Sequence, residues 1–130
     1  MEQDMLKTHG VFSWNELMTT DVPGAKKFYS ELLGWTFNEI NSTGMDYTMV
    51  KVGDREVGGI MAMPPEAQGM PPAWGSYVTV KNVDALAERV EKLGGKILLP
   101  AQNIPNVGRF MVIQDPQGAV LSLITYVNKD

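Results

Sequence analysis

One segment of this chain occurs twice, and the repeat restricts the folds that the chain can adopt. Residues 20–34, TDVPGAKKFYSELLG, align with residues 81–95, KNVDALAERVEKLGG, 61 positions later. Each copy opens on a residue type that caps helices and closes on glycine: Asp21 and Gly34, then Asn82 and Gly95. Between these ends, apolar residues recur at the spacing of a helix with one buried face. The repeat therefore predicts two equivalent amphipathic helices.

Segments typical of β-strands surround each helix in the same order. They are residues 11–19, 35–40, 47–52 and 56–63 around the first helix, and 73–80, 96–100, 108–114 and 119–127 around the second. The proline-rich residues 64–72 fit neither a helix nor a central strand, so they are predicted to be a linker.

This layout predicts one α+β domain, residues 1–130, made of two βαβββ modules in tandem. Module one covers about residues 9–63 and module two about 73–127. Each module should be a curved mixed sheet with one helix on one face. Because the other face must be closed by the twin module, we expect the two to enclose a cleft suited to a small ligand.

Composition excludes several classes of protein. The net charge is −4, from 11 basic and 15 acidic residues without a basic block, so a nucleic-acid partner is not expected. The apolar stretches are far shorter than the roughly 18 residues of a membrane span, and residues 1–10 lack the apolar core of a signal peptide. Cysteine is absent, which excludes disulfides and thiolate metal sites. We expect a cytoplasmic protein without a membrane partner.

The repeated modules, the helix block from Asp21 to Trp35 and the turn Asp115-Pro116-Gln117-Gly118 resemble the vicinal oxygen chelate superfamily. That superfamily includes glyoxalase I, bleomycin-resistance proteins and extradiol dioxygenases, and the resemblance covers about residues 9–127. It implies the paired βαβββ fold and a homodimer. It does not imply one reaction, because this fold serves many activities.

Metal-dependent members of that superfamily place four His, Glu or Gln ligands on the first and last strands of the two modules. Carried over to this sequence, those positions are Trp14, Gly59 (or Met61 in a register shifted by two), Gly75 and Ser122. None is a credible ligand for a catalytic divalent cation. The single histidine, His9, is expected to be solvated, whereas catalytic zinc or iron sites need about three strong ligands. We therefore expect neither a metal nor another cofactor.

Strand alternation predicts which residues share the cleft face. With Arg109 added, the candidate ligand-binding residues are Phe12, Trp14, Met61, Met63, Gly75, Thr79, Arg109 and Ser122. Aromatic and methionine side chains would accept an irregular apolar ligand, and the two glycines would enlarge the space. The alternative is that Phe12, Met61 and Met63 simply fill a core.

Glu16 is the candidate general base, because it lies on an otherwise apolar strand two places from Trp14. A carboxylate in an apolar lining has a raised pKa and can accept a proton from a ligand. Tyr77, at the equivalent place in the second module, is a candidate hydrogen-bonding partner. Alternatively, Glu16 pairs with a cation such as Arg109, or caps a strand end. Arg109 itself could hold an anionic ligand group or lie on a sheet edge in water.

The sequence favours a metal-independent member of the superfamily that binds a small apolar or aromatic molecule. It either sequesters that molecule or transfers a proton with Glu16, so whether the protein is an enzyme is open. The alternative is a divalent-metal lyase or dioxygenase, which requires His9, Glu16 or Glu56 to meet in space. A third possibility is a non-catalytic partner domain that uses its sheet edge.

Overall fold

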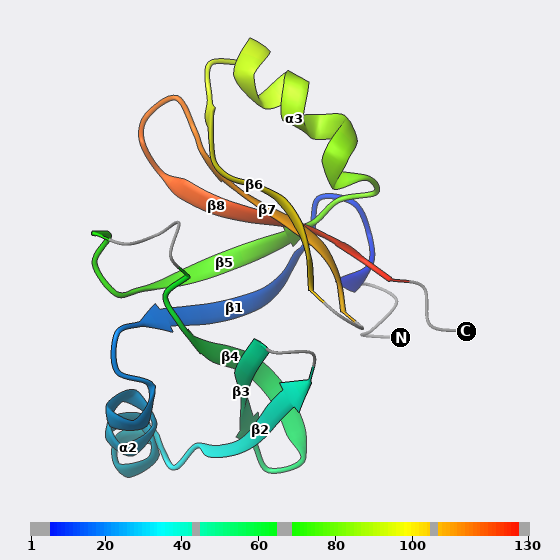
Figure 1. Cartoon of the computed structure of the whole chain (residues 1–130). Helices are drawn as coiled ribbons and strands as arrows, with labels where there is room; N and C mark the ends of the chain where they lie inside the picture. Colours follow the sequence, from blue (N-terminus) through cyan, green and yellow to red (C-terminus); the bar gives the residue numbers. More distant parts are fainter. Residues whose placement is uncertain (1–5, 43–44, 65–68, 105–106, 128–130) are drawn as a thin grey trace. The chain divides into compact units, whose positions relative to one another are not determined.

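The structure is a computed structural model that describes residues 6–42, 45–64, 69–104 and 107–127 (Figure 1). Its helices are α2 (Val22–Leu33) and α3 (Val83–Lys92). Its strands are β1 (Phe12–Thr19), β2 (Thr36–Ser42), β3 (Met45–Val52), β4 (Arg55–Ala62), β5 (Ala73–Thr79), β6 (Lys96–Ile104), β7 (Gly108–Gln114) and β8 (Val120–Tyr126). Every predicted helix and strand is confirmed, and β6 runs beyond Pro100 to Ile104. Part of the predicted linker, residues 65–68, lies outside the described residues.

The predicted residues cap the start of both helices. Asp21 accepts a hydrogen bond from the backbone N–H of Gly24 at 2.9 Å, which satisfies one of the free donors in the first turn of α2. Gly34 ends α2 with φ 76°, a left-handed conformation that glycine adopts at little cost. The Asn82 side chain caps α3 in the same way as Asp21 caps α2.

The predicted end of the second helix is wrong by one glycine. Helix α3 ends at Lys92, and Gly94 rather than Gly95 takes the left-handed conformation, with φ 93°. The residue just past the helix end needs this conformation, and Gly94 stands there. The next residue, Gly95, packs closely against β7. A Cβ atom on it would lie 2.8 Å from the Gln114 carbonyl oxygen.

The chain divides into two compact units, which share one internal topology. Unit 1 comprises residues 1–13 and 76–130, and unit 2 comprises residues 14–75. The strand order is β2-β3-β4-β1 in unit 2 and β6-β7-β8-β5 in unit 1. In each, the outer strands pair antiparallel, whereas the first strand of the module pairs parallel with the last, β1 with β4 and β5 with β8. The sequence repeat is thus a structural repeat, and the α+β fold is confirmed.

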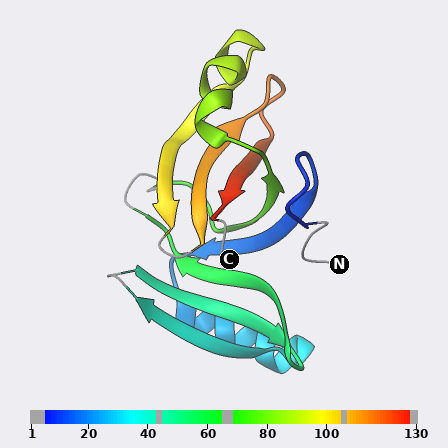
Figure 2. The ribbon, with the colours of Figure 1, turned by 90° about the vertical axis from the view of Figure 1, so that its right-hand side faces the viewer.

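Each unit has its core between its helix and one face of its sheet. In unit 2 the buried apolar cluster is Leu17, Val50 and Ile60, with Val22, Ala25 and Tyr29 of α2 packed against it. Figure 2 shows α2 running along one face of the sheet that contains β2 and β3. In unit 1 the buried apolar cluster is Val80, Val83, Met111 and Leu123, with Leu86, Ala87 and Val90 of α3 packed against it. Helices α2 and α3 thus each cover one face of the sheet of their own unit.

Within the described ranges, neither helix has the length and apolar character that crossing a membrane requires.

Candidate functional site

Glu16 lies on the face of the unit 2 sheet that is opposite α2. Its neighbour Leu17 packs in the core beneath α2, and successive side chains of a strand point to opposite faces. Glu16 is the register partner of Gly59 in the parallel β1–β4 pair, and only 4% of it is exposed. The candidate base is therefore buried on this face, beside a residue that has no side chain.

Tyr47 fills the space above Gly59. Met49 of β3 pairs with Gly59, so Tyr47, two residues away on the same face, is its diagonal neighbour and within reach of an aromatic side chain. A Cβ atom added to Gly59 would lie 1.7 Å from the Tyr47 hydroxyl oxygen and 2.1 Å from Cζ. The expectation that Gly59 enlarges a ligand space is therefore wrong. At Gly75, by contrast, an added Cβ atom would come no closer than 4.0 Å, to the Glu16 carbonyl oxygen.

A hydrogen bond joins the Tyr47 hydroxyl to strand β1. Trp14 donates its indole Nε1–H to the Tyr47 oxygen at 2.9 Å. Trp14 thus lies on the same face as Tyr47, and strand alternation places Glu16, two residues further along β1, on that face as well. The face around Glu16 also carries three partly buried methionines, Met18, Met49 and Met61. The described residues named here place the Glu16 carboxylate among aromatic and methionine side chains.

Unit 1 repeats this arrangement with different residues. Tyr77 of β5 is the register partner of Ser122 of β8, as Glu16 is of Gly59. Both are buried, at 3% and 7% exposure, and the Tyr77 ring lies 6.1 Å from the ring of Phe110. Thr79 is also buried and donates its hydroxyl to the carbonyl of Leu6. The structure therefore brings Tyr77, Thr79 and Ser122 together in unit 1.

Two predicted ligand-binding residues lie at the margins. Phe12, at the start of β1, is 66% exposed, so the alternative that it fills a core is wrong. Met63 lies just past the end of β4, where its backbone N–H binds the Thr19 carbonyl at 3.2 Å.

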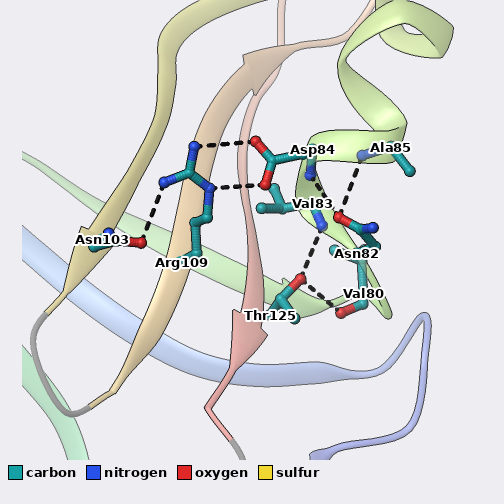
Figure 3. A network of polar contacts seen from close by, with 8 residues as sticks. All are labelled: Val80, Asn82, Val83, Asp84, Ala85, Asn103, Arg109 and Thr125. Atoms are coloured by element: carbon teal, nitrogen blue, oxygen red, sulfur yellow. Dashed lines mark hydrogen bonds and ion pairs between the residues drawn. The ribbon is translucent and has the colours of Figure 1, made fainter.

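Arg109 is engaged on the α3 side of unit 1 (Figure 3). Its Nε and Nη2 donate to the Asp84 carboxylate at 2.8 and 3.1 Å, and its Nη1 donates to Asn103 at 3.1 Å. These hydrogen bonds hold the pKa of Asp84 below its ordinary value and raise that of Arg109. Arg109 precedes Phe110, which packs on Tyr77, so alternation directs Arg109 to the other face. The structure does not bring Arg109 together with Tyr77 and Ser122.

The residues at the carried-over ligand positions do not fit a divalent metal. The indole N–H of Trp14 is a donor without a lone pair for a cation, Gly59 and Gly75 have no side chain, and Ser122 offers a weak neutral oxygen. In the described part of the chain, no three His, Asp or Glu residues gather where they could hold a metal ion. His9 is exposed, and its Nδ1 accepts the backbone N–H of Lys81 at 3.0 Å.

Sequence reasoning missed two tyrosines. Tyr47 became visible only when the β3–β4 register was known, although a glycine inside a strand, such as Gly59, signals a close approach. Tyr126 was likewise missed, and its hydroxyl lies 2.8 Å from that of Ser13. Burial raises the pKa of Tyr126, and the hydrogen bond to Ser13 opposes that rise.

The structural repeat defines the class of protein, an α+β chain of paired βαβββ modules. Residues 11–123 match the model of the Glyoxalase/Bleomycin resistance protein/Dioxygenase superfamily. The chain belongs to that superfamily.

Two proteins and one solved structure illustrate what this chain is similar to. One relative is CFP32 of Mycobacterium tuberculosis, which is named as a glyoxylase. It is 41% identical over 117 residues, and the match covers 88% of this chain and 45% of CFP32. The chain thus spans about half the length of that relative. A glyoxylase-like domain-containing protein of Didymella fabae is 30% identical and is matched over 98% of its length, with 93% of this chain covered. Methylmalonyl-CoA epimerase from Mycobacterium tuberculosis has the same fold, with a TM-score of 0.62, 19% identity, and coverage of 98% and 97% of the two chains.

Proposed function

We propose that this chain binds a small, largely apolar or aromatic molecule without a metal, and that Glu16 serves as general base for proton transfer to or from that molecule. The observation that carries the proposal is the burial of Glu16, which is only 4% exposed. It lies beside Gly59, where the resemblance implies a metal ligand and where Tyr47 fills the space instead.

The donor chemistry supports metal independence. In unit 2 the carried-over positions are Trp14 and Gly59, which supply an indole N–H and no side chain. A ligand side chain at position 59 would also have to displace Tyr47, whose hydroxyl lies 1.7 Å from the Cβ position. For the metal-dependent alternative, His9 and Glu56 are exposed whereas Glu16 is buried, and nothing observed favours their meeting.

The environment of Glu16 supports a functional carboxylate. Desolvating a carboxylate opposes folding, so a buried glutamate on an apolar strand departs from the pattern that stability alone would favour. Such departures concentrate at functional sites. A base held close to a bound molecule contributes roughly 10²–10⁴-fold to the rate of a proton transfer.

The surroundings support an apolar ligand. Trp14 and Tyr47 offer ring surface, and the methionines of the same face adapt to irregular shapes because their side chains are flexible and polarisable. They are Met18, Met49 and Met61.

A neutral aromatic dye tests the binding proposal. N-phenyl-1-naphthylamine is titrated against EDTA-treated protein, and its fluorescence should rise as it enters an apolar site. Met61→Asp should weaken its binding by roughly fivefold or more, about 1 kcal/mol. Met70→Asp is the matched control, since Met70 is 45% exposed outside this face, and it should leave the affinity unchanged. Equal affinities in all three proteins would contradict the proposed surface.

Glu16→Gln tests the chemistry. The amide keeps the shape of the side chain, so the dye should bind with nearly unchanged affinity. A substrate found by displacement of the dye should lose roughly 100-fold or more in kcat/KM, since the amide cannot accept the proton. Full turnover by Glu16→Gln would remove Glu16 from the reaction.

A further inference from the structure

The Tyr47 hydroxyl is placed where it can reach the Glu16 carboxylate. Its oxygen lies 1.7 Å from the position of a Cβ atom on Gly59, so it stands almost where the first side-chain atom of residue 59 would be. Gly59 is the register partner of Glu16, and neighbouring strands lie about 4.8 Å apart. A glutamate side chain is long enough to span that separation.

The hydrogen bond from Trp14 determines the role of the Tyr47 hydroxyl. A phenolic oxygen has one proton to donate and two lone pairs to accept with. Because Trp14 donates to the Tyr47 oxygen at 2.9 Å, one lone pair is taken and the proton of Tyr47 points elsewhere. A hydroxyl that accepts one hydrogen bond also donates its own proton more strongly.

The described side chains of unit 2 that share the face of Glu16 on β1, β4 and β3 offer few donors. On its own strand Met18 has none, and the indole N–H of Trp14 is already given to Tyr47. On the same face of β4 and β3, the described neighbours Gly59, Met61 and Met49 carry no N–H or O–H on their side chains. Among these bordering side chains, the hydroxyl of Tyr47 is the donor that can serve the carboxylate.

We propose that Tyr47 is a positioning residue for Glu16: its hydroxyl, held by the Trp14 N–H, donates the hydrogen bond that fixes the orientation of the Glu16 carboxylate. The functional meaning of this hydrogen bond rests on the proposed role of Glu16 as base. The three side chains form a relay from β1 through β3 and back to β1, with Gly59 leaving the space through which it passes.

The test uses NMR on the unliganded chain, labelled with 15N and with 13C in the side-chain carboxyl of glutamate. Tyr47→Phe removes the hydroxyl and keeps the ring. It should move both the Trp14 indole resonance and the Glu16 carboxyl resonance by more than their linewidths. Glu16→Gln and Trp14→Phe assign the two signals.

The chain offers a matched control in a second indole-to-phenol hydrogen bond of the same unit. Trp74 donates its Nε1–H to the Tyr29 hydroxyl at 3.0 Å. Tyr29→Phe should move the Trp74 indole resonance and leave the Glu16 carboxyl resonance in place. A Glu16 signal that responds equally to both variants would reflect general loosening and would overturn the proposal.

An unchanged Glu16 resonance in Tyr47→Phe would also overturn the proposal, because Tyr47 would then serve Trp14 alone. Trp14→Phe provides a second reading, since it keeps the Tyr47 hydroxyl: it should move the Glu16 signal less than Tyr47→Phe does. If Tyr47→Phe does not fold, Trp14→Phe and Tyr29→Phe still test the relay. A Glu16 carboxyl resonance that responds equally to both variants, or to neither, would contradict it. These signals come from the unliganded chain, so they are independent of whether Glu16→Gln loses turnover.

Discussion

The hydroxyl oxygen of Tyr47 lies 1.7 Å from the place that a Cβ atom on Gly59 would occupy. This relationship joins β3 to β4 on the face opposite α2, and the Trp14 N–H extends it to β1 at 2.9 Å. Gly59 stands at a position where the superfamily resemblance implies a metal ligand. The space above this glycine is filled by an aromatic side chain from a neighbouring strand.

Gly59→Ala should destabilise the protein, because the new methyl group cannot coexist with the Tyr47 phenol and must displace it. We expect a loss of about 1–3 kcal/mol in the free energy of unfolding, measured by urea denaturation. Gly75→Ala is the matched control, since its Cβ atom would approach no atom more closely than 4.0 Å, and it should change stability by less than about 1 kcal/mol.

A double-mutant cycle attributes the effect to this contact. In the Tyr47→Ala background, Gly59→Ala should cost clearly less than in the wild-type chain, because the clashing ring is gone. Equal costs in both backgrounds would show that Tyr47 is not the obstacle.

Arg109→Met should destabilise the protein at neutral pH and matter less in acid. The ion pair with Arg109 lowers the pKa of Asp84 from its ordinary 3.8, so the folded state binds the Asp84 proton more weakly than the unfolded state. The stabilisation is therefore fully present above the ordinary pKa and is lost as the pH falls through the lower folded value. Urea midpoints at pH 7 and at decreasing pH measure it. The difference in urea midpoint between the wild-type chain and Arg109→Met should therefore shrink as the pH falls. Arg89→Met, on the exposed side of α3, should show no such decrease. A difference for Arg109→Met that stays constant with pH would contradict the role of the Asp84 pKa.

Tyr126 should ionise at a higher pH than an ordinary tyrosine, because burial disfavours the phenolate. Absorbance at 295 nm, compared between the wild-type chain and Tyr126→Phe, isolates its titration. Ser13→Ala should raise the pKa of Tyr126 further, since the hydrogen bond between the Ser13 and Tyr126 hydroxyls lowers it, whereas Ser30→Ala on α2 should not. Stability should fall as the pH rises above about 10, because the unfolded chain loses this proton first. A Tyr126 that titrates at or below its ordinary pKa of 10.0 would contradict its burial.

The repeat made the fold predictable, and local rules explain why. Helix spacing, the caps Asp21 and Asn82 and the turn at Asp115–Gly118 act over a few residues, so a single sequence carries them. Alternation along β1 correctly separated Glu16 from Leu17, because a strand's side-chain period depends on nothing beyond the strand.

The contacts that define the site escaped prediction because they depend on register between strands. Nothing local links Tyr47 to Gly59, or Arg109 to Asp84, which stands 25 positions away. The space expected at Gly59 was wrong for the same reason: a glycine shows that a side chain is missing but not which neighbour fills the gap. The cleft between the modules remains a prediction.

Metal content measures metal independence. Untagged protein is incubated with nickel, zinc, manganese and iron, desalted, and analysed by elemental mass spectrometry, with dye binding measured before and after EDTA. We predict less than about a tenth of an equivalent of every metal and an affinity that EDTA does not change, because the ligand positions supply no donor set. One tightly held metal per chain, with dye binding lost in EDTA, would contradict the proposed function and restore the metal-dependent alternative.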